Sequence, residues 1–427
     1  MDLEFSSGLA SAGCSGNGEG MSSSKPTDSA VPDNEEGYFH LIASGEPYRL
    51  LFPVGAFIGI LGVLMWPLFV WHVLKTYPGT AHPRVMIEGF LTCFVIGFIG
   101  TALPRILDVP RMTLKEALGF SGALLGIAAL HFTGHIAGGD ELFFMTLLVL
   151  VCGMAFRSIF RQDTPPPAFM LVGLGILSAL TGDAIQIVAQ IAPTTLSGPA
   201  TTMGRLLLYQ GYLLLPIMGI GAFLLPRFFS MPNRQSFPES RGLPPGWKRR
   251  ALFALVCGVS VLASFALEAA GWLRLGYGLR AGAVLFYFFR EVPIHQAGFA
   301  GGTLALTLRI ALVSIPCGYL LMAFQPERTV TFLHIVFITG FSLITLTVAT
   351  RVVLGHSGQS HLFRATLRSV LVMASFVAVA MLTRVSADWM PALRLNHYAY
   401  AALVWIAGVI TWAAVILPGV LLAGSDE

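Results

Sequence analysis

The ten histidines of this 427-residue sequence are its best candidates for metal chemistry. A neutral imidazole is a common ligand of haem iron, copper and zinc. Six of them fall near the same end of long apolar segments: His72, His82, His131, His135, His334 and His397. Because a metal site between helices needs ligands at one depth, these six are candidate ligands. The alternative for each is a hydrogen bond to headgroups or water at the interface.

Spacing along the chain sorts the histidines further. His131 and His135 form an H-x-x-x-H pair, which on one helix would place both imidazoles on the same face, although Gly134 indicates a helix end nearby. His334 and His356 would be about 33 Å apart on one continuous helix, at 1.5 Å per residue. They therefore cannot bind the same ion, and His334 belongs with the outer histidines while His356 belongs to the inner surface.

Ionisable side chains inside apolar segments form a second group of candidates: Glu88, Asp183, Glu268, Arg280 and Arg309. A charge at the centre of a lipid-facing helix costs about 2.5–3.5 kcal/mol, so these side chains are expected to face the protein interior. Each marks either a functional site or ion path, or a structural salt bridge. Gln186 and Gln190 follow Asp183 at helical spacing and extend one polar stripe.

Composition indicates that membrane helices position these residues. Hydrophobic residues make up 55% of the chain and charged residues 11%, whereas a soluble domain carries about 25% charged residues. Many apolar blocks approach the ~20 residues needed to cross ~30 Å of hydrocarbon. The chain has no Walker A loop, no H-E-x-x-H, no G-x-S-x-G and no basic–aromatic pattern for nucleic acid. Its five cysteines are scattered and indicate no disulfide framework.

We predict an all-α, polytopic transmembrane bundle of about twelve spans. The spans are expected at 48–74, 86–106, 114–132, 140–160, 167–191, 203–226, 250–271, 275–293, 299–323, 329–354, 363–384 and 397–422. Residues 1–46 are predicted to be a disordered tail because they are polar and lack apolar runs. The basic, Pro-rich linker 227–249 is expected to separate two halves of six spans, 47–226 and 250–422, with 423–427 as the C-terminus.

The distribution of Lys and Arg predicts the orientation. They are more frequent in the loops on the side of the N-terminus, and positive loops stay in the cytoplasm. Both termini are therefore expected to be cytoplasmic, in a multi-pass membrane protein. Leu-Pro-Arg occurs at two cytoplasmic helix ends, 103–105 and 225–227, which hints at an internal duplication.

The most distinctive motif covers residues 332–358. Leu333 and His334 open a span, Arg351 follows seventeen residues after His334, and the sequence Leu-Gly-His-Ser-Gly then occupies 354–358. This resembles the signature of the NnrS family, which has Thr where this chain has Ser357. Looser similarity at 47–52, 82–104 and 226–229 extends the resemblance over most of residues 47–422.

The resemblance implies a twelve-span bacterial inner-membrane protein that contains haem and copper and is associated with denitrification and nitrosative stress. It places His334, Arg351 and His356 at the motif positions of the family. It also places His82 at the first His of a His-x-His-Glu motif.

The chain departs from the family pattern beside His82. Arg84 and Val85 occupy the positions of the second His and the Glu, and a family His of the ninth helix is missing near 316–319. Glu88 and His72 are nearby groups that could take the place of the missing ligands.

Our first hypothesis is a haem-binding membrane protein that responds to nitric oxide, with copper as a second possible metal. The cofactor-binding residues would be His334, His82, His356 and Arg351, and His72 and His131 are further metal-ligand candidates. NO is small and apolar, so it can reach such a site through the lipid.

Two other functions fit the same pattern of residues. A secondary transporter would use Asp183, Glu268 and Arg309 to carry a coupling ion or substrate across two halves of six spans. A structural or assembly subunit would need neither haem nor a gradient.

Overall fold

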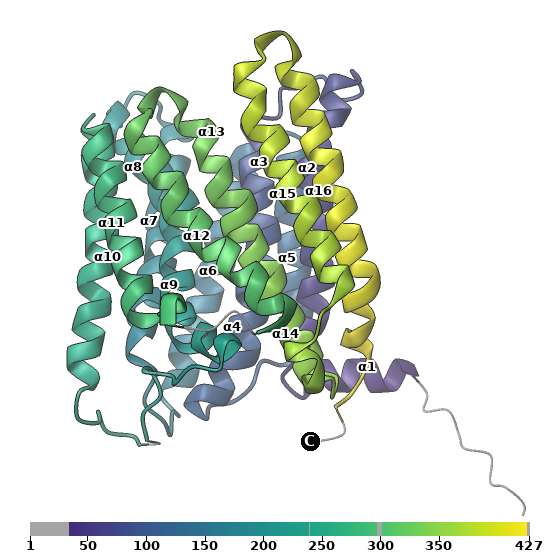
Figure 1. Ribbon diagram of the computed structural model, residues 1–427, viewed down its shortest axis with the longest axis vertical. Coiled ribbons are helices and arrows are strands. Elements are labelled where there is room, and N and C mark those ends of the chain that lie inside the picture. The colour runs from purple at the N-terminus through teal and green to yellow at the C-terminus, as the bar shows by residue number, and fades with distance from the viewer. Residues whose placement is uncertain (1–33, 239, 297–300, 425–427) are drawn as a thin grey trace, which may run out of the picture.

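The protein is built from helices, and the computed structural model describes residues 34–238, 240–296 and 301–424 (Figure 1). The α-helices are α1 (Asn34–Ala43), α2 (Tyr48–Val70), α3 (Ala81–Arg84), α4 (Thr92–Leu107), α5 (Leu114–Phe132), α6 (Ile136–Ser158), α7 (Met170–Ile191), α8 (Gly198–Leu206), α9 (Tyr212–Leu224), α10 (Trp247–Ala269), α11 (Leu273–Glu291), α12 (Gly302–Phe324), α13 (Thr329–His334), α14 (Leu343–His356), α15 (Arg368–Ser386) and α16 (Arg394–Ile416). The described ranges contain no strand, which confirms the predicted all-α class.

Shorter helical segments interrupt or extend these elements. Three are π-helical: η1 (Val85–Leu91), η3 (Leu207–Gly211) and η7 (Ile335–Ser342). The 3-10 segments are η2 (Pro167–Phe169), η4 (Leu225–Phe229), η5 (Ile294–Gln296), η6 (Pro326–Arg328), η8 (Ser360–Arg364), η9 (Ala387–Trp389), η10 (Pro391–Leu393) and η11 (Leu417–Leu421).

Each of the twelve predicted spans corresponds to a helix or to a run of joined helices. Within the described part of the chain, ten of these are long and apolar enough to cross a membrane. The other two, α5 and α11, are shorter, with 19 residues each, and include Lys115 and Glu116 in α5 and Arg280 and Arg290 in α11. The protein is therefore a polytopic helical bundle, in which α5 packs against α6 and α11 packs against α10 and α12.

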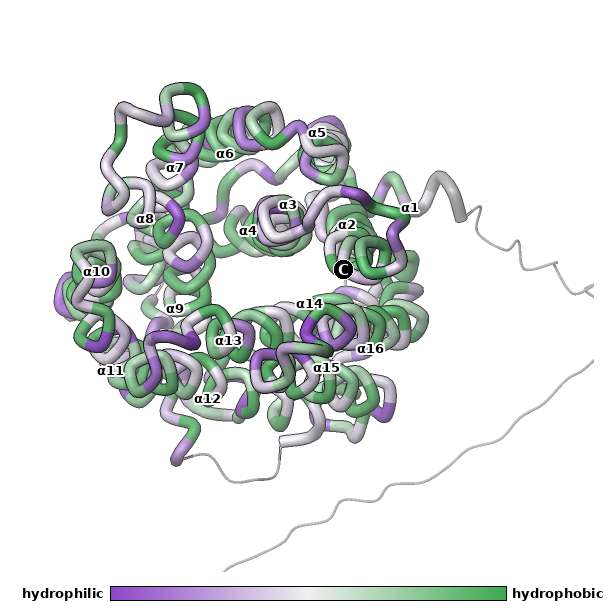
Figure 2. Tube along the Cα trace, turned by 90° about the horizontal axis from the view of Figure 1, so that it is seen from above, coloured by the Kyte–Doolittle hydropathy of each residue, from purple (hydrophilic) through white to green (hydrophobic). Residues whose placement is uncertain are grey.

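The helices close into a ring when viewed along their axes (Figure 2). The last long helix, α16, packs against the first, α2. Arg49, at the start of α2, donates hydrogen bonds from Nη1 to the carbonyls of Val420 (2.6 Å) and Leu422 (2.8 Å). Both ends of the described chain thus lie at one end of the bundle, here called the proximal end, and we call the opposite end distal (Figure 1).

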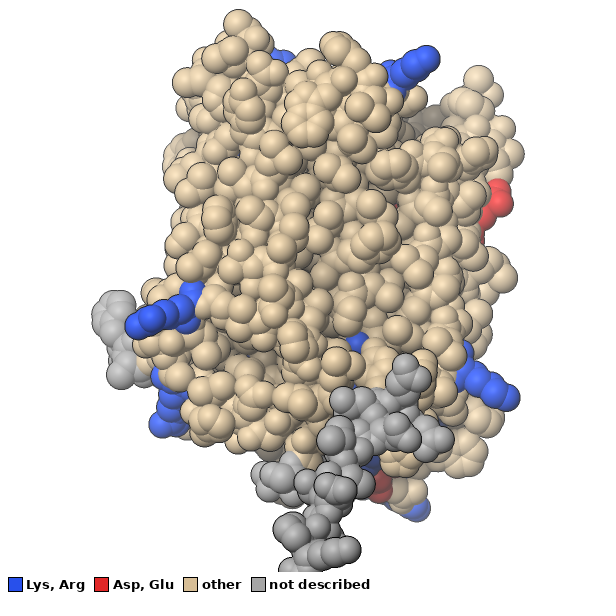
Figure 3. All heavy atoms as spheres, turned by 90° about the vertical axis from the view of Figure 1, so that its right-hand side faces the viewer, with Lys and Arg blue, Asp and Glu red and all other residues tan. Residues whose placement is uncertain are grey.

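The outer surface of the bundle suits a lipid environment. On the face in Figure 3, charged side chains are few, and most of the surface between the two ends is uncharged. Large apolar residues are exposed there, such as Ile410 and Val415 of α16. In water such a surface would be unfavourable, whereas in hydrocarbon it has no cost.

Three of the spans lie on the inner side of the ring. The runs 81–107, 198–229 and 326–356 have 78%, 72% and 61% of their apolar windows buried, whereas the other spans have 33–56%. Each of these three interior spans contains one of the π-helical segments. A π-helical turn holds one extra residue and is frequent at functional sites, so the interior spans are where a site is expected.

The three interior spans also share a sequence pattern. At each π segment a polar residue is followed by a glycine and an aromatic residue, and a Leu-Pro-Arg or Leu-Gly-His triplet comes later in the same span, after the same number of residues each time. The three pairs are Glu88-Gly89-Phe90 with 103–105, Gln210-Gly211-Tyr212 with 225–227, and Thr339-Gly340-Phe341 with 354–356. The pattern recurs once in every four spans. It therefore also marks three units of four spans, while the expected division into two halves of six stays a prediction.

The structure also differs from the expected tail at 1–46. Residues 34–43 form α1, and Glu46 is only 1% exposed. The reason is local: Tyr38 donates a hydrogen bond to the Arg49 carbonyl (3.1 Å), and Arg111 donates one to the Ser44 carbonyl (2.8 Å). A polar segment can be ordered when its few contacts are with a packed helix end. Residues 1–33 lie outside the described residues.

Candidate functional site

A cavity of about 540 Å³ opens in the distal half of the bundle, and we call it the histidine cavity. Its walls come from α2, α3 with η1, α13 with η7, α15 and α16. His82 and His334 both line it, from two different interior spans. The remaining lining is largely apolar and aromatic: Trp66, Phe90, Phe337, Tyr398 and Trp405 among others. Cofactor sites are commonly apolar cavities of this size with a few polar groups.

Both imidazoles have the same orienting hydrogen bond. His82 Nδ1 lies 2.9 Å from the Gly62 carbonyl, and His334 Nδ1 lies 2.6 Å from the Val330 carbonyl one turn earlier in α13. A carbonyl can only accept, so Nδ1 carries the proton in both rings. Nε2 then holds the free lone pair, which is the arrangement found in histidines that bind metal ions.

A buried arginine adds positive charge to the cavity. Arg384 of α15 lines it and is 7% exposed. Its Nη1 has no hydrogen-bond partner among the described residues, although it lies 3.6 Å from Asp388 Oδ2, and its guanidinium stacks 4.0 Å from the Tyr398 ring centre. Arg205 of α8 also lines the cavity. The guanidinium groups of these two arginines can donate hydrogen bonds to the carboxylates of a bound cofactor.

Other distal histidines lie outside this cavity. His72 is exposed in the loop after α2, with φ +61°. His397 makes a hydrogen bond from Nδ1 to the Leu393 carbonyl (3.1 Å) but does not line the cavity. The H-x-x-x-H pair does not share a helix, because α5 ends at Phe132: His131 is fully buried in a separate cluster, while His135 is exposed and contacts Thr133. The expected chelating face is therefore absent from this described segment.

Arg351 and His356, the two other residues of the 332–358 motif, lie at the proximal end. This agrees with the helix-length argument that His334 and His356 are too far apart to bind one ion. His356 Nδ1 donates to Glu46 Oε1 (2.6 Å), which also accepts from Arg105 Nη2 (2.7 Å), while Arg49 Nε donates to Glu46 Oε2 (2.5 Å). We call these four residues the Glu46 junction. Burial alone would raise the pKa of the Glu46 carboxyl, but His356 and Arg49 outweigh it and lower that pKa to about 2.

Arg351 has a packing role in the structure. Its guanidinium lies 4.1 Å from the Phe363 ring centre and 4.6 Å from the Phe228 ring centre. Cation–π contacts of this kind stabilise a helix end by about 0.5–2 kcal/mol. The structure does not bring Arg351 to the histidine cavity.

Four of the five intramembrane charges divide into two clusters, and the guanidinium of the fifth, Arg309, lies 5.1 Å from the Phe229 ring centre. Arg280 donates to Ser264 Oγ (3.0 Å), Gln210 Oε1 (2.7 Å) and Glu268 Oε2 (2.6 Å), so its charge is balanced and its donors are used. Glu88 and Asp183 lie in the other cluster with His131. The Glu268–Arg280 pair is a structural salt bridge, one of the two alternatives considered from the sequence.

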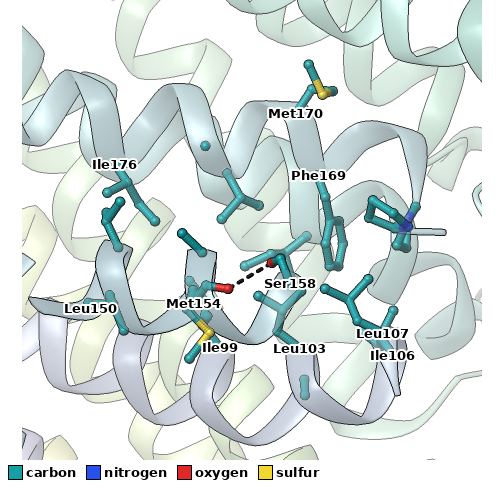
Figure 4. Close-up of a pocket in the computed structure, with 18 of the residues that line it drawn as sticks. Ile99, Leu103, Ile106, Leu107, Leu150, Met154, Ser158, Phe169, Met170 and Ile176 are labelled. Carbon is teal, nitrogen blue, oxygen red and sulfur yellow. Dashed lines mark hydrogen bonds between the residues drawn. The ribbon is translucent and has the colours of Figure 1, made fainter. Parts of the chain in front are cut away.

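A second cavity, of about 420 Å³, lies between α4, α6 and α7 near the proximal end (Figure 4). Aliphatic and aromatic side chains such as Leu103, Met154 and Phe169 line it. The Ser158 hydroxyl there donates its proton to the Met154 carbonyl of its own helix (2.8 Å).

Two residues of the distal half were missed from the sequence. Arg384 was counted only as a charge at a span end, and Asp140 was taken as a span boundary. A signal did exist for Arg384, because Asp388 follows it at i+4 and such a pair is a frequent ion pair in helices.

The fold and the histidine cavity define a polytopic helical membrane protein with two imidazoles from separate spans facing one interior cavity. A family model described as NnrS protein matches residues 43–423, nearly the whole chain. The chain therefore belongs to the NnrS family. No curated protein matched it.

Proposed function

We propose that the chain binds haem in the histidine cavity, with His82 and His334 as iron ligands, and that it acts in the response to nitric oxide or in denitrification. The observation that carries the proposal is the meeting of two imidazoles in one apolar cavity of about 540 Å³. Each has Nδ1 engaged by a backbone carbonyl, so each offers Nε2 to a metal.

The rest of the cavity suits a large apolar cofactor that carries carboxylates. Aromatic rings such as Trp66 and Trp405 can cover the faces of a macrocycle. Arg384 brings a buried Nη1 that has no hydrogen-bond partner in the described chain, which a carboxylate would satisfy. Both imidazoles are used for iron in this proposal, so copper is not placed in this cavity.

Haem would supply an iron centre for NO, and with both imidazoles on the iron, NO would have to replace one of them. The chain itself holds the imidazoles in one tautomer, balances negative charge with Arg384 and keeps the walls apolar. NO is more soluble in apolar surroundings than charged ligands are, so an apolar cavity inside a membrane bundle favours it over anions.

We further propose that the protein lies in the bacterial inner membrane with its proximal end in the cytoplasm. Support comes from basic residues at that end, such as Arg241 in the loop before α10 and Lys248 and Arg249 in the first turn of α10. The histidine cavity would then open toward the periplasmic half.

Purified protein in detergent tests the haem proposal. After expression with added haem precursor, wild type is expected to show a Soret band at about one haem per chain, and His334→Ala is expected to lose it. His397→Ala is the matched control, because His397 is another distal histidine with an Nδ1 bond to the carbonyl four residues earlier but lies outside the cavity. Wild type without haem, or equal loss in His397→Ala, would refute the assignment.

A further inference from the structure

A second group of titratable side chains lies buried between η1, α5, α6 and α7, apart from the histidine cavity. Glu88, His131, Asp140 and Asp183 are each 0% exposed, and Arg84 is 6% exposed. None of the first four lines the histidine cavity. The cluster brings together side chains from four different spans.

Three of these side chains point their ligand atoms at one place. His131 Nε2 lies 2.7 Å from Glu88 Oε2 and 3.7 Å from Asp140 Oδ1. Ligand atoms of the three residues lie within 4.8 Å of one another. Donor atoms that share one ion at about 2.0–2.2 Å are ~3 Å apart, so the Nε2–Oδ1 pair at 3.7 Å would close by about 0.7 Å when an ion replaced the Nε2 proton.

The charge of the cluster is not balanced by its own residues. Arg84 pairs with Asp140 through Nε (2.7 Å) and Nη2 (3.1 Å), and Gln190 Nε2 also donates to Asp140 (2.5 Å). That pairing leaves the carboxylates of Glu88 and Asp183 without a cation. Two unpaired carboxylates are costly to bury, and one divalent cation would balance both.

Unpartnered atoms point in the same direction. Both carboxylate oxygens of Asp183, Oε1 of Glu88 and Nδ1 of His131 are buried without a hydrogen-bond partner in the described part of the chain. Asp183 lies close enough to Glu88 and Asp140 to interact with their charges. The Arg280–Glu268 cluster in the same bundle has its charges balanced one to one, so a buried carboxylate without a cation is not a general feature of the described fold.

The backbone holds the His131 ring in place. Gly139, next to Asp140 in α6, packs so closely on the imidazole that a Cβ at this position would overlap the ring. Glu88 lies in the π-helical turn of η1. Both features restrict the positions of side chains in the cluster.

We propose that Glu88, His131 and Asp140 bind one divalent first-row metal ion, with Asp183 completing the site directly or through a water molecule. One imidazole nitrogen with carboxylate oxygens suits Mn²⁺, Fe²⁺ or Zn²⁺ and contains no soft sulfur ligand for Cu⁺. The ion would join four spans at the interface of the first two four-span units. The inference does not depend on haem in the histidine cavity.

Mn²⁺ binding to purified protein tests the site without interference from haem iron. Chelator-stripped protein is offered Mn²⁺, and bound Mn²⁺ is measured by elemental analysis after gel filtration and by the loss of the free-ion electron paramagnetic resonance signal. Wild type is expected to retain about one Mn²⁺ per chain. Glu88→Gln and Asp183→Asn are expected to bind at least about tenfold more weakly, because each removes a charge that balances the ion.

Glu268→Gln is the matched control, since it removes one buried carboxylate charge outside the cluster and is expected to bind Mn²⁺ as wild type does. Thermal unfolding reports whether each variant is folded, and Mn²⁺ is expected to raise the melting temperature of wild type but not of Glu88→Gln. Folded wild type that retains neither Mn²⁺ nor Zn²⁺ would overturn the proposal and leave the cluster as a site that holds protons. Equal binding by wild type, Glu88→Gln and Asp183→Asn would overturn it as well.

Discussion

The Glu46 junction gives a pH prediction whose size follows from the structure. Glu46 lies before α2, is 1% exposed, and contacts His356, Arg105 and Arg49. These contacts connect the start of α2 with the end of α14, and Arg49 continues to the chain end at Val420. Loss of the Glu46 charge is therefore expected to loosen the proximal end of the ring.

The magnitude comes from the pKa of Glu46, which falls from 4.5 to about 2 in the folded protein. At 1.36 kcal/mol for each pKa unit, the ionised carboxylate stabilises the fold by about 3 kcal/mol at pH 7. Because the folded-state pKa is lowered, this stability is fully present above pH 4.5. It is lost as the pH falls from about 4.5 to 2, with roughly half remaining near pH 3.

Unfolding of wild type and Glu46→Gln in detergent, measured between pH 7 and pH 3, checks this reasoning. The variant is expected to be about 3 kcal/mol less stable at pH 7, and the gap should narrow as the pH falls below 4.5. Glu141→Gln is the control, because Glu141 is an exposed acid whose loss should change stability by less than ~0.5 kcal/mol. A gap that stays constant down to pH 3, or one below ~1 kcal/mol at pH 7, would refute the account.

Three further predictions concern other parts of the bundle. Arg384→Gln is expected to lower haem affinity by about 10-fold or more through the loss of a charged hydrogen bond, measured by haem transfer to apomyoglobin; unchanged transfer would argue against carboxylate binding there. Gly340→Ala should destabilise the protein by about 1–3 kcal/mol, because the new Cβ would lie 2.7 Å from Ile315 Cγ1. Gly282→Ala is the control: this glycine has open space around it, so the substitution should stabilise the protein by ~0.5–1 kcal/mol, with thermal unfolding as the measurement for both variants. Arg280→Met should cost about 3–5 kcal/mol by leaving Glu268 uncompensated, and adding Glu268→Gln should recover part of that loss; no recovery would contradict the ion-pair explanation.

Apolar block length was enough to place the spans. Each predicted span corresponds to a helix because ~20 apolar residues are needed to cross the bilayer regardless of detail. The alternation of spans then put His82 and His334 at the same end, and the cavity contains both. The assignment of His356 to the opposite end followed from helix rise alone.

Other features depend on contacts that a single sequence does not display. The π-helical turns at Gly89, Gly211 and Gly340 have no distinct periodicity, so their relation was visible only once the structure marked them. Asp140 looked like an interfacial residue because it begins a span, yet packing of α6 against α5 buries it with Arg84. Glu46 was assigned to a disordered tail because composition averages over a segment and does not register one anchored residue.

The closed ring has a consequence for the order of the chain. Because α16 lies beside α2 and Arg49 bonds to the carbonyl of Val420, the described ends are already neighbours. A peptide linker could join residue 424 to residue 34, so that α1 and Glu46 are kept, and new termini could be opened in the 231–246 loop. Such a circularly permuted protein would keep every helix next to its present neighbours, so the bundle would be defined by its packing and not by where translation begins.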